Sequence, residues 1–113
     1  MEKIVILGGK ELKLQSSLFT IIDYRNVFGS ELFSDVSKIE KLSKKETEDY
    51  SLLIDLIFKL TYILHKPYSK FTYEEFLKSL DFNVISDIDS LQKLSNVIGE
   101  MLGTFNNDPP FSE

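Results

Sequence analysis

The stretch LLIDLIFKLTYIL, residues 52–64, decides the fold of this chain. It is apolar on nearly every side, with one aspartate and one lysine among its large side chains, and a helix of that kind is surrounded by other elements at the centre of its fold. Ser43 and Glu46 have the S-x-x-E spacing of a capping box, and Pro67 stops the pattern. The sequence therefore predicts a central helix at 44–65.

Two short apolar runs near the N-terminus flank the pair Gly8-Gly9. A two-residue loop in which both positions can adopt positive φ is typical of a β-hairpin, which we place at 3–14. The face expected to meet the core carries Val5, Leu7, Leu12 and Leu14, and the opposite face carries Ile4, Ile6, Glu11 and Lys13. Two interpretations of the second face stay open: a helix covers it too, or Ile4 and Ile6 contact another chain.

Helical spacing of apolar side chains predicts four further helices, at 16–28, 30–42, 72–80 and 87–102. Gly29 is suited to end the first of them. Thr72 and Glu75 form a second capping box, and Ser86 with Asp89 is expected to cap the last helix.

With 113 residues, of which 42% are hydrophobic and 12% aromatic, the chain has the size and the apolar content of one domain. The predicted fold is mainly α with a small N-terminal β-hairpin (α+β), a single compact bundle of about five helices. We place this globular domain at 1–103. Residues 104–113, which include Asn-Asn-Asp-Pro-Pro, are expected to form a flexible C-terminal tail.

The charge and composition exclude several classes of protein. A net charge of −5 lacks the cationic footprint of a nucleic-acid binder, and the absence of cysteine excludes disulfide scaffolds and thiolate metal sites. No segment has the length and apolarity of a signal peptide or a membrane span, so the expected compartment is the cytoplasm. Residues 1–70 hold 11 basic and 10 acidic side chains and 71–113 hold 2 and 8, which indicates a solvated acidic face or a surface for a basic partner.

No motif in the sequence indicates a catalytic site. Gly8-Gly9 lies between two strands rather than between a strand and a helix, which is unlike a phosphate-binding loop. His65, the single histidine, lacks partners at a recognisable spacing, and Glu74 and Glu75 occupy the first turn of a helix, where negative charge is favoured in any case. We therefore expect no catalytic residues, no cofactor and no metal, and a protein whose work is contact with another protein.

The order of these elements carries a resemblance over residues 3–103. A very short hairpin with Gly8-Gly9 comes first, then FTII at 19–22 and the Phe-Gly stop at 28–29. The long apolar helix, the start FTYEEFL at 71–77 and an acidic last helix follow. In this arrangement the chain resembles the tail assembly chaperones of long-tailed (siphovirus-type) phages and prophages of Gram-positive bacteria.

The resemblance implies a non-enzymatic assembly factor that is absent from the mature virion and works in the cytoplasm of the bacterial host. Such proteins bind the tape-measure protein, a very long helical chain, and keep its apolar stripes from aggregating until the tail tube polymerises around it. The family also implies self-association, and often a longer form made by ribosomal frameshifting whose extension recruits the tail-tube protein. Neither a nucleic acid nor a membrane is an expected partner.

The expected mechanism is helix capture, in which an apolar groove accepts successive amphipathic segments of the client. The candidate partner-binding residues are Ile4, Ile6, Leu32, Phe33 and Val36, with core packing as the alternative for each. Other functions remain open: a structural head–tail connector or completion protein, a small cytoplasmic protein-interaction module, an antitoxin-like regulator or a small enzyme.

Overall fold

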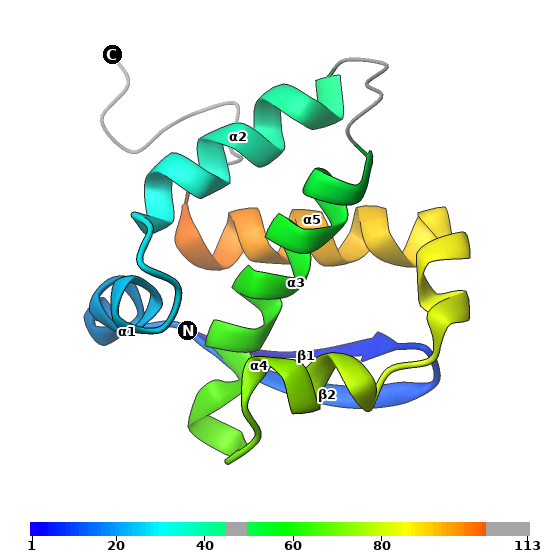
Figure 1. The fold of residues 1–113 in the computed structure, drawn as a ribbon, viewed down its shortest axis with the longest axis horizontal. Helices are drawn as coiled ribbons and strands as arrows, with labels where there is room; N and C mark the ends of the chain where they lie inside the picture. The colour runs from blue at the N-terminus through cyan, green and yellow to red at the C-terminus, as the bar shows by residue number, and fades with distance from the viewer. Residues whose placement is uncertain (45–49, 104–113) are drawn as a thin grey trace.

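The computed structural model describes residues 1–44 and 50–103. Its elements are β1 (Glu2–Leu7), β2 (Lys10–Gln15), α1 (Leu18–Phe28), α2 (Leu32–Lys44), α3 (Tyr50–His65), the 3-10 helix η1 (Lys66–Tyr68), α4 (Tyr73–Lys78), the 3-10 helix η2 (Phe82–Ser86) and α5 (Ile88–Leu102). The fold is thus mainly α with a small N-terminal hairpin, as predicted (Figure 1). The predicted start of the central helix at 44 is wrong, because Ser43 and Lys44 are the last two residues of α2. Glu46 of the proposed capping box and the tail at 104–113 lie outside the described residues.

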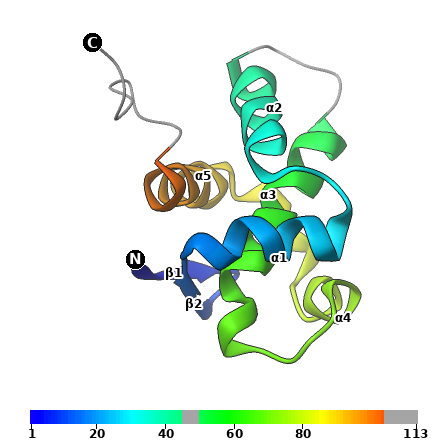
Figure 2. The same ribbon diagram turned by 90° about the vertical axis from the view of Figure 1, so that its left-hand side faces the viewer.

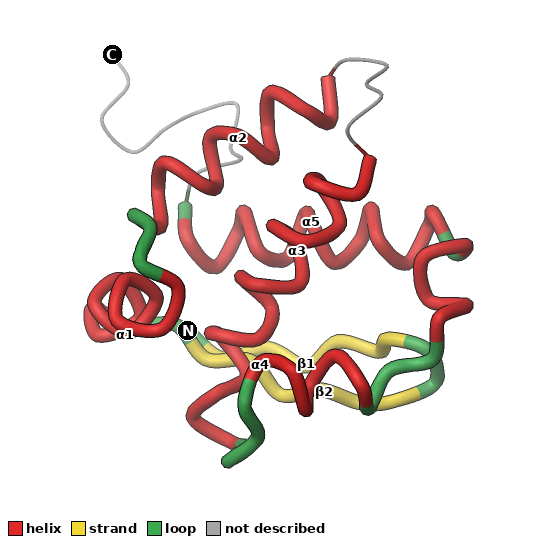
Figure 3. Tube along the Cα trace, in the orientation of Figure 1, coloured by secondary structure: helices red, strands yellow, loops and turns green. Residues whose placement is uncertain are grey.

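The hairpin forms in the predicted register. Val5 pairs with Leu12 and Leu7 with Lys10 across an antiparallel pair of strands. Gly8 and Gly9 have φ values of 60° and 77°, so the tight turn uses the left-handed region at both positions. Figure 3 shows α3 and α5 above the hairpin, and β1 contacts α5 while β2 contacts α3. The hairpin therefore has one inner face and one outer face.

Helix α3 is the centre of the fold, because it contacts all the other α-helices and β2. Its side chains from Leu56 to Leu64 are buried apart from that of Lys59, as expected for a helix that is apolar on nearly every side. The helix gives way to η1, whose first turn contains Pro67. At this end His65 Nδ1 lies 2.8 Å from the carbonyl oxygen of Lys13, which ties α3 to the end of β2.

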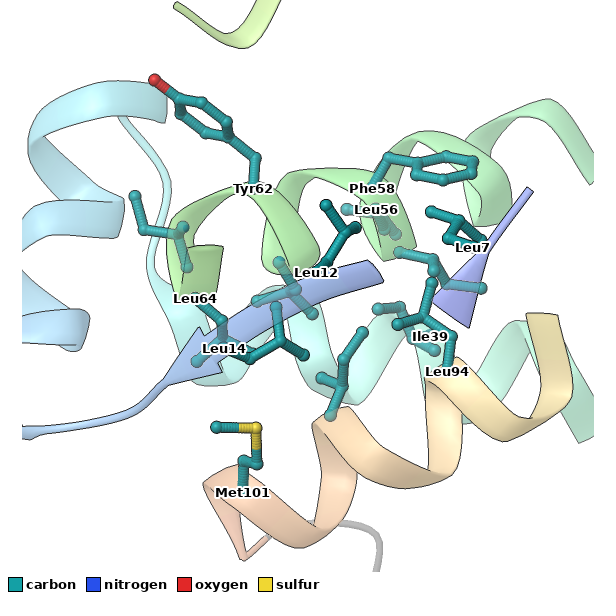
Figure 4. Packing of buried hydrophobic residues seen from close by; sticks show 14 of the residues in the cluster. Leu7, Leu12, Leu14, Ile39, Leu56, Phe58, Tyr62, Leu64, Leu94 and Met101 are labelled. Carbon is teal, nitrogen blue, oxygen red and sulfur yellow. The ribbon is translucent and has the colours of Figure 1, made fainter. Parts of the chain in front are cut away.

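The core lies between the inner face of the hairpin, α2, α3 and α5. Figure 4 shows the hairpin leucines gathered with side chains of the three helices; the labelled members are Leu7, Leu12, Leu14, Ile39, Leu56, Phe58, Tyr62, Leu64, Leu94 and Met101. Alternation along the strands delivers the leucines to one side, and the helices meet them there. None of the described helices is both long enough and apolar enough to span a membrane.

Local hydrogen bonds set the helix ends. Thr72 and Glu75 form the predicted capping box: the Glu75 amide donates to Thr72 Oγ1 over 3.1 Å, and the Thr72 amide donates to Glu75 Oε1 over 2.8 Å. The expected cap of the last helix was wrong, because η2 carries the chain one residue further and Asp87, not Ser86, caps α5. The Asp87 carboxylate accepts from the Ser90 amide over 3.1 Å and from the Ser90 hydroxyl over 2.7 Å.

Candidate protein-contact surfaces

The outer face of the hairpin is open. Ile4 is 57% exposed and Ile6 is 66% exposed, and across the ladder they pair with Lys13 and Glu11. None of the described helices covers these side chains, so the interpretation in which a helix covers this face is wrong. Contact of Ile4 and Ile6 with another chain stays a prediction. Two large apolar side chains side by side on a half-polar strand face make a small surface suited to contact with another chain.

The remaining predicted contact residues do not join the hairpin in one surface. Leu32 and Val36 are fully buried and belong to the core, where their spacing of four residues turns both toward α3. Phe33, which follows Leu32 by one position, points the other way and is exposed. The structure thus leaves three of the five candidates, Ile4, Ile6 and Phe33, available to a partner, and it assigns Leu32 and Val36 to the alternative of core packing.

A second apolar surface, which the sequence pattern did not predict, lies on α1. Leu18, Phe19 and Ile22 are 85%, 60% and 56% exposed, and their spacing places them on one side of the helix. We call these three residues the α1 surface. Because α1 is apolar on both sides, the spacing of its apolar residues does not predict which side faces the core. The buried residues of α1 are Thr20 and Tyr24.

A buried hydrogen bond explains this orientation of α1. The Tyr24 hydroxyl donates to Asp35 Oδ2 on α2 over 2.6 Å, and Tyr24 and Asp35 are both buried. The Lys38 ammonium lies 3.6 Å from the other carboxylate oxygen. A carboxylate removed from water needs such donors, so the Tyr24–Asp35 pair fixes α1 on α2 with Leu18, Phe19 and Ile22 turned outward.

A second tyrosine–aspartate pair holds α4 on α3. The Tyr73 hydroxyl donates to Asp55 Oδ1 over 2.9 Å, and the Lys59 ammonium lies 3.2 Å from Asp55 Oδ2. Both tyrosines belong to a cluster of aromatic side chains in which the centroids of neighbouring rings are 5.0–6.1 Å apart. Its members are Tyr24, Phe28, Tyr62, Tyr73 and Phe76. These polar groups therefore orient helices around an aromatic core.

Burial and the neighbouring carboxylates raise the pKa values of Tyr24 and Tyr73 well above their ordinary range. Both phenols stay protonated in the folded state, whereas in the unfolded chain they ionise near pH 10, so stability falls as pH rises above that value. We expect the free energy of unfolding to decrease by about 1.4 kcal/mol per pH unit for each tyrosine above about pH 10.

Denaturant unfolding between about pH 9 and about pH 11 measures this slope. Tyr24→Phe is the matched variant, since it removes one of the raised tyrosine ionisations and is expected to have a shallower slope. A free energy of unfolding that does not change across this range in the wild type would contradict the assignment of both tyrosines as protonated hydrogen-bond donors.

A pocket of about 300 Å³ opens between the hairpin turn and the start of α5, and it is lined by Gly8, Asp81, Asn83, Val84, Asp87 and Ser90. Two of its carboxylates already accept hydrogen bonds from neighbouring residues. The Asp81 carboxylate accepts from the Asn83 amide, and the Asp87 carboxylate accepts from the hydroxyl and amide of Ser90, which lowers the pKa of Asp87. Within residues 1–44 and 50–103, no group of three or more metal-ligating side chains could hold an ion. The pocket is therefore explained by helix capping.

Comparisons of the chain with protein-family models, with curated proteins and with solved structures give no match.

Proposed function

We propose that the protein is a non-enzymatic phage tail assembly chaperone that binds the tape-measure protein and keeps it soluble during tail morphogenesis. The observation that carries this proposal is the uncovered apolar outer face of the hairpin, where Ile4 and Ile6 lie between charged cross-strand neighbours. The order of elements over residues 3–103, which resembles that of such chaperones, supports the same function.

The hairpin face suits an amphipathic client segment. Ile4 and Ile6 supply apolar contact, while Lys13 and Glu11 beside them offer one charge of each sign to the polar flank of a bound helix. Two isoleucines bury little area, so each contact is weak. Many copies along one very long client then give a high avidity without a strong individual site.

The wider proposal concerns the partners and the place of action. The protein acts in the cytoplasm of the bacterial host, is released before the virion is complete, and has a longer frameshifted form that recruits the tail-tube protein. A slippery heptamer near the end of the coding sequence with an overlapping frame that continues past Glu113 is the expected genetic signature. A structural head–tail connector would instead remain in purified particles.

The test is co-production of the protein with the tape-measure protein of the same phage. The wild type is expected to keep the client in the soluble fraction. The double variant Ile4→Thr with Ile6→Thr retains β-branched residues in β1 but removes the apolar contact, and it is expected to bind the client 10- to 100-fold more weakly, on the order of 1 kcal/mol per side chain.

Glu11→Thr is the matched control, because it places the same residue on the same face without removing apolar area. It removes one exposed charge beside the isoleucines and no apolar contact, so it is expected to weaken binding at most about fivefold. Equal binding by the double variant, with the circular dichroism unchanged, would overturn the assignment of the hairpin face.

A further inference from the structure

Helix α1 opens with an apolar side chain that is almost fully in water. Leu18 is 85% exposed, a larger fraction than that of any other large apolar side chain in the described residues. Together with Phe19 and Ile22 it makes the α1 surface, and the exposed Asn26 continues the same side of the helix. A segment that covered this surface would remove three large side chains from water, which is favourable.

The end of α5 lies close to the start of α1. In Figure 1 it is just above α1, at the same end of the molecule, and Figure 2, turned by 90°, again shows it above the first turn of α1. Gly103 closes α5, because its amide donates a hydrogen bond to the carbonyl oxygen of Gly99. Residues 104–113 therefore leave the domain beside the α1 surface.

The two flanks of the α1 surface differ in charge. Asp23 and Arg25 lie on opposite flanks, because each helical residue is turned by about 100° from the last. The Asp23 flank faces η1, where the Lys66 ammonium lies 3.1 Å from Asp23 Oδ1. In both views η1 is below α1 and the end of α5 is above it, so the Arg25 flank is turned toward α5. Arg25 is exposed, and none of the described carboxylates forms an ion pair with it.

The carboxylates at this end of the domain leave the Arg25 flank positive. Glu31 accepts hydrogen bonds from two amides at the start of α2, and Glu100, near the end of α5, forms an ion pair with Lys3. Glu2 is exposed at the start of β1. The first turn of α1 contains no acidic residue, so the positive end of its helix dipole is unmatched. An acidic segment is therefore favoured along the Arg25 flank.

The sequence of residues 104–113, TFNNDPPFSE, complements this surface. Phe105 and Phe111 supply apolar side chains, while Asp108 and Glu113 give the segment a net charge of −2, because it contains no basic residue. The pair of prolines restricts the backbone before any contact forms, which reduces the conformational entropy lost on docking.

The reach of this segment selects the α1 surface. An extended chain spans about 3.3–3.6 Å per residue, so Phe111, eight residues beyond Gly103, reaches as far as about 26 Å. The whole of α1, with 11 residues, is about 16 Å long. The exposed Phe82 and Ile88 lie at the opposite end of α5, which has 15 residues and is about 22 Å long, and Phe105 cannot span that distance.

We propose that residues 104–113 dock on the α1 surface of the same chain, with the two phenylalanines against its apolar side chains and Asp108 beside Arg25. The segment then shields α1, so that another protein reaches this helix only by displacing it. Because segment and surface belong to one chain, their effective concentration is in the millimolar range, and a weak contact suffices. This inference is independent of the proposed function, because it uses neither the hairpin face nor the client.

The test is paramagnetic relaxation enhancement, measured by NMR on the full chain. The sequence contains no cysteine, so Ser112→Cys introduces a single thiol for a nitroxide label. The label is expected to broaden the amide signals of residues 18–25 far more than those of α4 and η2. Absence of broadening in α1, or stronger broadening of the hairpin or of η2, would overturn the inference.

Isotope mixing separates docking within one chain from capture by a second copy. Isotope-labelled protein that lacks the nitroxide is mixed with nitroxide-labelled protein of natural isotopic abundance. Its α1 signals are expected to stay sharp. Broadening in this mixture as strong as in the singly labelled chain would show that the segment docks on another copy, which contradicts the proposal.

Variants of the α1 surface identify the docking site. Phe19→Asp is expected to lose most of the broadening of the other α1 signals, and Leu18→Asp is an independent variant of the same surface. Phe82→Asp is the matched control, since it makes the same change at an exposed phenylalanine away from α1, and it is expected to behave as the wild type. Circular dichroism checks that each variant is folded. Broadening that persists in both α1 variants would overturn the assignment of the site.

Charge reversal tests the contact between Asp108 and Arg25. Arg25→Glu is expected to lower the ratio of docked to undocked chains about threefold, and adding Asp108→Arg is expected to restore most of it. Lys93→Glu, on the exposed side of α5, makes the same change in net charge and is expected to have no effect. Unchanged docking of the Arg25→Glu variant would contradict the placement of Asp108 beside Arg25.

Discussion

Replacing Leu60 with alanine is expected to lower the free energy of unfolding by about 2–5 kcal/mol. Leu60 is fully buried near the middle of α3, the helix on which the hairpin and the other α-helices meet. Truncating it loses the transfer free energy of the side chain and leaves a cavity between elements that cannot all move inward together. Denaturant unfolding at neutral pH measures the loss as a decrease in the transition midpoint.

Leu52→Ala is the matched control on the same helix. Leu52 is 43% exposed, so its truncation leaves no closed cavity and is expected to cost less than about 1 kcal/mol. Equal losses for the two leucines would contradict the placement of α3 at the centre of the core.

Replacing Gly8 with alanine is the second change for which we expect a large effect. A Cβ at this position would lie 2.7 Å from Val84 Cγ2, where the hairpin turn packs against η2. The residue also has φ = 60°, a conformation that costs a residue with a side chain roughly 1–2 kcal/mol. Overpacking adds about 1–3 kcal/mol. We therefore expect a total loss of about 2–5 kcal/mol in the free energy of unfolding.

Gly9→Ala separates the two causes. Gly9 has a similar φ of 77°, but nothing lies within 4 Å of the position of its Cβ. Its substitution is expected to cost only the backbone strain, so the difference between the two alanine variants reports the contact with Val84. Thermal unfolding compares them directly, and equal melting temperatures would show that the turn does not pack on η2 as described.

The elements that could be predicted from sequence are those whose residues specify them locally. Gly8-Gly9 sets both the turn type and the register, because the register of a hairpin follows from its loop. Thr72 and Glu75 start α4 through hydrogen bonds within four residues. The cap of α5 was misplaced by one residue because η2 includes Ser86, so that Asp87 follows η2 and caps α5.

The orientation of α1 could not be predicted, because it depends on a contact between helices. Apolar residues occupy both sides of α1, so hydrophobic burial alone does not select the inner side. The Tyr24–Asp35 bond selects it, and no local pattern relates these two residues. The same holds for the contact surfaces: alternation places Ile4 and Ile6 together, but only the packing of the helices leaves them exposed.

The most direct test of the proposed function is a tagged pull-down from cells in which the parent phage is assembling, with the bound proteins identified by mass spectrometry and compared with those of purified particles. We predict recovery of a very long, helix-rich tape-measure protein, much less of it with the Ile4→Thr and Ile6→Thr double variant, and absence of the tagged protein from finished virions. Recovery of only capsid or portal proteins, together with retention of the tagged protein in purified particles, would contradict the chaperone function and favour a structural connector.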